Sequence, residues 1–187
     1  MKTVLTCFAL LLCNVYSHFL FAQCGTERWL VKTLQDADTA NIRWRAVTST
    51  VSGQLQKTKP VYHENNPRDS TELRVYKMDC ILVKYKEEDD HDWHLIVQDL
   101  VTNEQMCVEI PDPADCSEVA ANPRFSKIAR ARSRIEMNVG PVMGSYRTPP
   151  AGKNKIQVTG VGFFDKKNHP TGFKGRELHP VLDLKFL

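Results

Sequence analysis

Glu177 and His179 are the residues whose types and spacing best suit chemistry. They lie two positions apart in a stretch with strand-like alternation, so we expect both side chains on one face. A neutral imidazole beside a carboxylate can hold a divalent metal ion, or act as a base and its orienting group in hydrolysis. His94, Asp99 and Asp165 are candidate neighbours from adjacent strands. Hydrogen bonding within the fold would use the same side chains, and the sequence contains no HExxH or GxSxG motif.

Basic and aromatic side chains form a second group of candidates, suited to binding a ligand. Residues 165–176 are rich in lysine and arginine, whereas residues 86–92 are acidic. Cations bind phosphates, and an aromatic ring stacks a base at about 1 to 3 kcal/mol. The candidate ligand-binding residues are Trp93, Lys166, Lys167, His169, Phe173, Lys174 and Arg176. Trp93 also alternates with Leu95 and Val97, which is typical of a core residue.

Five stretches of apolar alternation predict the strands that must position these side chains. The first three are separated by short turns and predict a meander. The last two close the chain. The predicted strands are residues 73–85, 93–99, 106–110, 156–164 and 177–186.

A change of period between the third and fourth strands predicts a helix. Asn122 suits the N-cap and Pro123 the first turn, and apolar residues then recur at helical spacing to about Met137. The order β-β-β-α-β-β is that of the OB-fold, a five-stranded Greek-key barrel. The sequence therefore predicts a mainly β domain over residues 73–187, with a small barrel of another topology as the alternative. OB-folds bind ligands between the loops that here span residues 86–92 and 165–176.

The N-terminal residues have the pattern of a secretory signal peptide. Lys2 precedes an apolar run, and Ala22 is a small residue at the expected cleavage point, so residues 1–22 are predicted to be removed. The protein is then secreted or periplasmic. We expect no membrane span, because no apolar stretch reaches about 20 residues. Residues 23–72 are expected to form an irregular extension with a β-like stretch over residues 42–51.

Composition restricts the class of partner. The net charge is only +3, which excludes a globally basic polyanion binder and leaves a local patch as the route to nucleic acid. Of the six cysteines, Cys24, Cys80, Cys107 and Cys116 follow the predicted cleavage point, and four cysteines permit three pairings. Cys24 and Cys116 lie in loop-like sequence, which favours a disulfide between them. Cys80 and Cys107 lie in strands, either bridged or as two small buried thiols.

Five segments together resemble a family of uncharacterised secreted bacterial proteins. The resemblance spans most of the chain and implies export and an OB-fold-like barrel, but no particular activity. Cys24 and Cys116 match recurrent cysteines of that family, whereas Cys80 and Cys107 do not. Members commonly carry a histidine-glycine pair after the GVGFFD motif, whereas here Pro170 follows His169. The segments are CGTERWLVKTLQD (24–36), HLIVQD (94–99), EIPDPADC (109–116), VTGVGFFD (158–165) and ELHPVLDL (177–184).

Three classes of function remain compatible with these patterns. The first is a secreted OB-fold-like binding module for an oligonucleotide or oligosaccharide. The second is a metal-dependent, nuclease-like hydrolase that uses Glu177, His179, Asp165 and His94. The third is a structural or accessory protein of the cell surface that binds a protein partner. No cofactor is predicted beyond the divalent metal of the second class.

Overall fold

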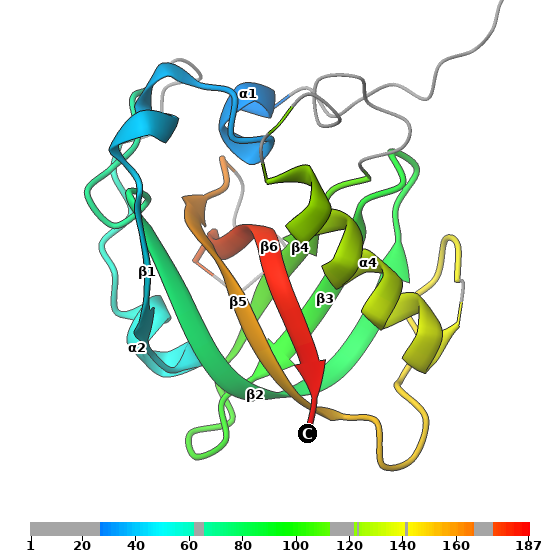
Figure 1. Ribbon diagram of the computed structural model, residues 1–187. Coiled ribbons are helices and arrows are strands. Elements are labelled where there is room, and N and C mark those ends of the chain that lie inside the picture. The colour runs from blue at the N-terminus through cyan, green and yellow to red at the C-terminus, as the bar shows by residue number, and fades with distance from the viewer. Residues whose placement is uncertain (1–26, 62–65, 113–121, 123, 141, 167–173) are drawn as a thin grey trace, which may run out of the picture.

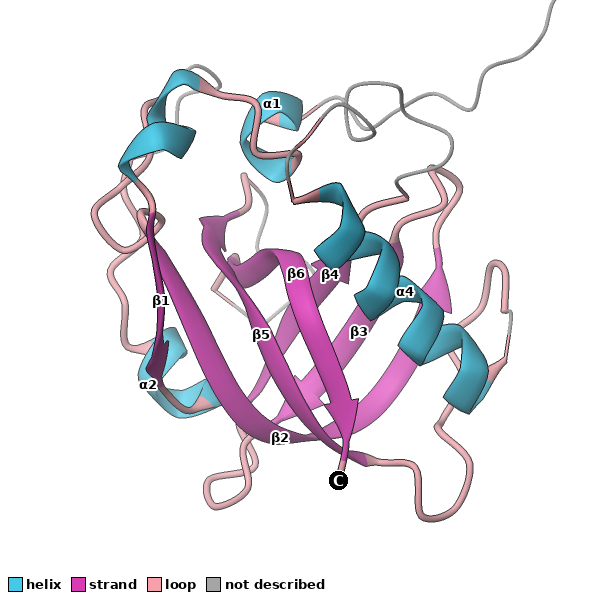
Figure 2. Cartoon of the chain, in the orientation of Figure 1, coloured by secondary structure: helices cyan, strands magenta, loops and turns pink. Residues whose placement is uncertain are grey.

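The computed structural model describes residues 27–61, 66–112, 122, 124–140, 142–166 and 174–187. The strands of these residues belong to one sheet, and the helices are placed around it (Figure 2). The strands are β1 (Arg43–Thr48), β2 (Arg74–Glu87), β3 (Trp93–Gln98), β4 (Gln105–Ile110), β5 (Lys155–Phe164) and β6 (Arg176–Phe186). The helices are α1 (Trp29–Lys32), the 3-10 turn η1 (Ala37–Asn41), α2 (Val51–Leu55) and α4 (Phe125–Val139).

Hydrogen bonding closes five of these strands into a barrel. The order is β2-β3-β4-β6-β5, and β5 returns to pair with β2. The β4–β6 pair is parallel, whereas the other pairs around the barrel are antiparallel. This is the predicted OB-fold-like Greek-key barrel, with α4 between its third and fourth strands, and the fold prediction is confirmed.

The barrel interior is apolar because alternate strand residues point inward. Trp93, Leu95 and Val97 of β3 lie in the core, and none of them is accessible to solvent. Helix α4 covers part of the barrel and packs on β6 through Ile128 and its helical neighbours (Figure 1). Within the described residues, no helix is long and apolar enough to cross a membrane.

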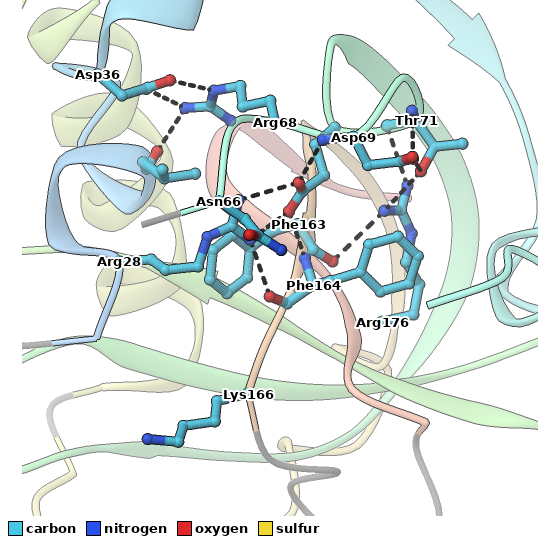
Figure 3. A network of polar contacts seen from close by, with 12 residues as sticks. Arg28, Asp36, Asn66, Arg68, Asp69, Thr71, Phe163, Phe164, Lys166 and Arg176 are labelled. Atoms are coloured by element: carbon cyan, nitrogen blue, oxygen red, sulfur yellow. Dashed lines mark hydrogen bonds and ion pairs between the residues drawn. The ribbon is translucent and has the colours of Figure 1, made fainter. Parts of the chain in front are cut away.

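The segment before the barrel contains the strand expected over residues 42–51 and also the short helices α1 and α2. Strand β1 pairs in parallel with the start of β2 and forms an edge of the sheet. Helix α1 lies near one end of the barrel in Figure 1. The carboxylate of Glu72 connects this region to β5, because it accepts hydrogen bonds from Arg28 Nη1 at 2.6 Å and from the Phe164 amide at 2.8 Å. Arg28 also donates to the Phe164 carbonyl at 3.1 Å (Figure 3).

Two further arginines extend this network, and both are buried. Arg68 donates from Nη2 to Asp36 Oδ1 and to the Val31 carbonyl, both at 2.7 Å (Figure 3). Arg176, the first residue of β6, donates to Gln54 Oε1 at 2.8 Å. The ion pairs and hydrogen bonds therefore fix α1 and α2 against the barrel, and this fixes Lys32, the last residue of α1.

Candidate functional site

A polar cluster lies on the outward face of β3, β4 and β6. Residues of these strands that alternate with the core residues point away from the interior. The strand register places His94 opposite Glu109, and Cys107 opposite Glu177. His179 lies two residues beyond Glu177 and reaches Glu109. All five side chains are buried although they are outside the apolar core.

His179 and Cys107 of the polar cluster have no accessible surface. The Nδ1 atom of His179 lies 2.8 Å from Glu109 Oε2, and its Nε2 atom lies 3.8 Å from Asp92 Oδ2. Neither nitrogen has a partner in hydrogen-bond geometry among the described residues. The short contact with Glu109 is therefore a close approach of two groups and not an aligned hydrogen bond. Asp92 is itself fixed, because its Oδ1 accepts the Asp112 amide at 2.9 Å.

His94 occupies the outer end of the cluster. Its Nδ1 atom lies 2.9 Å from Glu88 Oε1, and its Nε2 atom lies 3.9 Å from Glu109 Oε1. The imidazole and the Tyr146 ring are arranged edge to face, with ring centroids 5.7 Å apart. Glu109 Oε1 also accepts a weak contact from the Cys107 thiol at 3.7 Å. Glu109 is thus the residue that connects the two histidines.

Two overlapping sets of side chains have the spacing of metal ligands. One is Asp92, Glu109 and His179, and the other is His94, Cys107 and Glu109. Within each set the ligand atoms lie within 4.8 Å of one another. This spacing is compatible with one ion bound at about 2.0 to 2.3 Å from each ligand. Carboxylate and imidazole ligands together suit zinc or manganese. Water would then occupy the coordination positions of the ion that the protein leaves open.

Burial makes the carboxyl groups of this cluster resist ionisation. The pKa of Asp92 is raised well above its ordinary value by burial and then by the nearby carboxylates of Asp90 and Glu109. The pKa of Glu177 is raised well above its ordinary value by burial and by Glu109 and Asp165. Burial and a hydrogen bond from Glu27 raise the pKa of Asp165 to about 7. A buried divalent cation would reverse these shifts by stabilising the ionised carboxylates.

Glu109 and the two basic groups beside it behave differently. Burial favours the neutral form of Glu109, but His179 and Lys32 outweigh it and hold the pKa of that carboxyl well below its usual range. Burial lowers the pKa of His179, so its imidazole is neutral near pH 7 and able to bind a metal. Burial also acts against the charge of Lys32, yet Glu109 and Glu177 raise its pKa overall. Lys32 therefore supplies one positive charge to a cluster with several acidic groups.

The sequence-predicted chemistry residues are mostly brought together. Glu177, His179 and His94 share the outward face, and Asp165 interacts electrostatically with Glu109 and Lys32. Asp99 lies elsewhere, because its carboxylate accepts the amides of Ser52 and Val101. The pattern missed Asp92, Glu109 and Lys32. Glu109 could have been predicted from the length of the turn between β3 and β4. A turn over residues 99–104 fixes the antiparallel register of the two strands, and that register places Glu109 opposite His94.

The sequence-predicted ligand-binding residues are scattered. Trp93 is a core residue that contacts Tyr85, with ring centroids 6.0 Å apart, so it does not present a stacking surface. Arg176 is buried in the network around Gln54 and is not available to a ligand. Lys166 and Lys174 are exposed at the two ends of the basic loop. Three predicted ligand residues and both cysteines of the predicted disulfide lie outside the described residues: Lys167, His169, Phe173, Cys24 and Cys116.

The two cysteines that the structure describes, Cys80 and Cys107, are buried free thiols. Burial raises the pKa of the Cys80 thiol to about 12, and the pKa of Cys107 is raised well above its ordinary value for the same reason.

Comparisons of the chain with protein-family models, with curated protein sequences and with solved structures found no match.

Proposed function

We propose that the protein is a divalent-metal-dependent hydrolase in which Asp92, Glu109 and His179 hold the ion. One observation carries the proposal: three buried ligand atoms from these residues lie within 4.8 Å of one another. Both ring nitrogens of His179 lack a hydrogen-bond partner among the described residues. A buried imidazole without partners is costly unless another group binds it. A metal ion would complete its coordination.

The position of the cluster supports a role in ligand turnover. OB-folds bind ligands on the outward face of their second and third strands, which here are β3 and β4. His94 and Glu109 lie on that face. A closed β-barrel is consistent with a binding module, and the proposal adds chemistry to such a module. The segments that carry the family resemblance supply Lys32, His94, Glu109 and Glu177 to this one place.

The chemistry follows from the charges of the site. A bound divalent ion would lower the pKa of a coordinated water to about 7 and so supply a nucleophile near neutral pH. Attack at the phosphorus or carbonyl carbon of an ester would break the bond to the leaving oxygen, which would then take up a proton. A carboxyl group must give a proton to the leaving oxygen, and Glu177, which lies buried on the same face opposite Cys107, is our candidate for that role. We take a phosphodiester as the substrate, and the predicted export of the chain makes that substrate extracellular or periplasmic.

A binding module without metal is the second candidate, and Lys32 favours it. The ammonium group of Lys32 interacts with Glu109, Glu177, Asp165 and Asp92. Together with protonation of Asp92 and Glu177, this charge stabilises the cluster without an ion. In that case the polar cluster fixes the fold of the face, and the ligand, an oligonucleotide or oligosaccharide, binds over it without being cleaved.

Metal content and turnover separate the two candidates. The purified protein would be dialysed against Zn²⁺, Mn²⁺, Mg²⁺ or Ca²⁺, and its metal measured by mass spectrometry alongside hydrolysis of bis(4-nitrophenyl) phosphate. We expect one equivalent of metal and metal-dependent hydrolysis, both lost in Glu109→Gln. Glu104→Gln is the matched control, because Glu104 lies at the turn after β3 and bonds Thr102. Absence of bound metal in the unaltered protein would overturn the hydrolase and leave the binding module.

A further inference from the structure

Helix α4 carries a row of cations that the polar cluster does not use. Lys127, Arg130 and Arg134 recur at helical spacing, beside the buried face that contains Ile128. Arg134 is paired with Asp183 of β6. Lys127 and Arg130 form no ion pair within the described part of the chain. Two of the three cations are therefore available to an anionic ligand.

These cations line a cleft of about 420 Å³ between α4 and β1. In Figure 1, β5 and β6 run between these two elements. Trp44 of β1 lines the opposite side of the cleft, and the guanidinium of Arg124 lies 3.5 Å from the centre of its indole ring. Asp183 contributes a negative charge to the lining, and it is already paired with Arg134. The cleft thus combines several positive charges with one aromatic ring.

A second basic hollow adjoins β1. It has a volume of about 620 Å³, and its lining includes Arg43, Lys57 and Arg74 but no acidic side chain. Trp44 and Arg43 are adjacent in β1, so alternation points them to opposite sides of that strand. One strand therefore has a basic hollow on each side. Two hollows suit a polymer with repeated charges better than a single small anion.

We propose that the cleft between α4 and β1 binds the phosphate backbone of a single-stranded nucleic acid. Residues three or four apart on a helix lie about 5 to 6 Å apart, so Lys127 and Arg130 can contact neighbouring phosphates. The guanidinium of Arg130 can form two parallel hydrogen bonds to one phosphate. The guanidinium of Arg124 already covers one face of the Trp44 ring, and the two together form a planar platform for an unpaired base beside those phosphates. This site is distinct from the metal cluster, and the proposal does not depend on hydrolysis.

A sulfated polysaccharide is the main competing ligand for such a cleft. It would satisfy the cations as well as a nucleic acid does. Sugar rings also pack on an indole ring, but the sulfates that cover a heparin chain bind a protein mainly through their charges. A loss of binding in Trp44→Ala is therefore expected for the nucleic acid and not for the sulfated polysaccharide.

The test measures fluorescence anisotropy of a labelled oligo-dT with the full mature chain, in chelator so that no cleavage occurs. The double variant Lys127→Glu/Arg130→Glu should bind at least about tenfold more weakly. The slope of log affinity against log salt should become shallower by about 1.4, because each lost phosphate contact on a single strand removes about 0.7. The control, Lys84→Glu/Lys153→Glu, changes the net charge equally but lies outside both hollows.

Trp44→Ala supplies the second measurement. It should weaken oligo-dT binding by about fivefold or more and leave heparin binding unchanged. Equal loss in the Lys84/Lys153 control would overturn the proposal, because binding would then depend on net charge alone. Heparin binding with no oligo-dT binding at low salt would also overturn it and assign the cleft to a sulfated polysaccharide. Because chelator is present throughout, failure here leaves the metal proposal unaffected.

Discussion

The imidazole of His179 and the carboxylate of Glu109 lie 2.8 Å apart between Nδ1 and Oε2, yet they do not meet the geometry of a hydrogen bond. His179 Nε2 faces Asp92 at 3.8 Å. The imidazole lies between two carboxylates, and both of its nitrogens lack a hydrogen-bond partner among the described residues. Either nitrogen therefore has a lone pair or a proton with which it can bind another group. This relationship makes His179 the most informative position for mutation.

His179→Ala should abolish metal binding and reduce hydrolysis of the phosphodiester substrate by at least about 100-fold, since metal-activated water carries the reaction. The measurement is kcat/KM at saturating metal, with bound metal measured on the same samples. Gln98→Ala is the control, because Gln98 lies at the end of β3 and its side chain donates a hydrogen bond to Asn103 in the following turn, outside the polar cluster. Full activity in His179→Ala would remove His179 from the mechanism.

Stability of the metal-free protein should fall as the pH rises from about 4 to 7. Asp165, Asp92 and Glu177 have raised pKa values, so the folded chain holds more protons than the unfolded chain across this window. His179, whose pKa is lowered, opposes this trend with one group against three inside the window, and Glu88, whose pKa is lowered from 4.5 to about 2, opposes it mainly below pH 5. Thermal unfolding in chelator at several pH values measures the slope, and Asp165→Asn should make it shallower. Added metal should flatten the slope, because the ion stabilises the ionised carboxylates. A slope that is the same with and without metal would contradict a metal site here.

Arg28→Met should lower the free energy of unfolding by about 3 to 5 kcal/mol, because it leaves the buried carboxylate of Glu72 without its cation. The double variant Arg28→Met/Glu72→Gln should recover part of this loss. Urea unfolding of both variants provides the comparison. Equal loss in the single and double variants would show that the ion pair is not the source of the effect.

Cys24→Ser should free the thiol of Cys116 and lower stability by about 2 to 4 kcal/mol, if the disulfide predicted from sequence forms. A thiol reagent applied to the native protein should find no reactive thiol in the unaltered chain. Cys80 and Cys107 are buried, with raised thiol pKa values, and should not react. The variant should show one reactive thiol. An unchanged thiol count would eliminate the pairing of Cys24 with Cys116.

The barrel could be predicted from sequence because its determinants are local. Apolar alternation indicates strands such as β3, and the change to helical spacing before Ile128 indicates α4. The order of three strands, a helix and two strands then indicates the OB-fold. The sequence also indicated Glu177, His179 and His94. It could not indicate Lys32, since nothing local in α1 shows that Lys32 interacts with Glu109 and Glu177. Ion pairs such as Arg28 with Glu72, 44 residues apart, decide that placement.

Asp92 illustrates a second limit of prediction. As part of an acidic turn it is indistinguishable by sequence from the exposed Asp89, and only the fold reveals that it is buried. Trp93 shows the opposite case. Its aromatic type suggested stacking, but its alternation with Leu95 correctly indicated the core. Periodicity was therefore a better guide than residue type for positions within strands.

The polar cluster joins a residue of the first helix described, Lys32, to a residue of the last strand, His179. Lys32 leaves the ribosome or a translocation channel early, and His179 leaves it among the last residues of the chain. The ligand set is therefore incomplete in every nascent chain that has not yet emerged to β6. If the chain is exported as residues 1–22 predict and the metal site forms as proposed, an ion can be captured only after export and folding, so the metal supply of the destination compartment would decide which ion the protein holds.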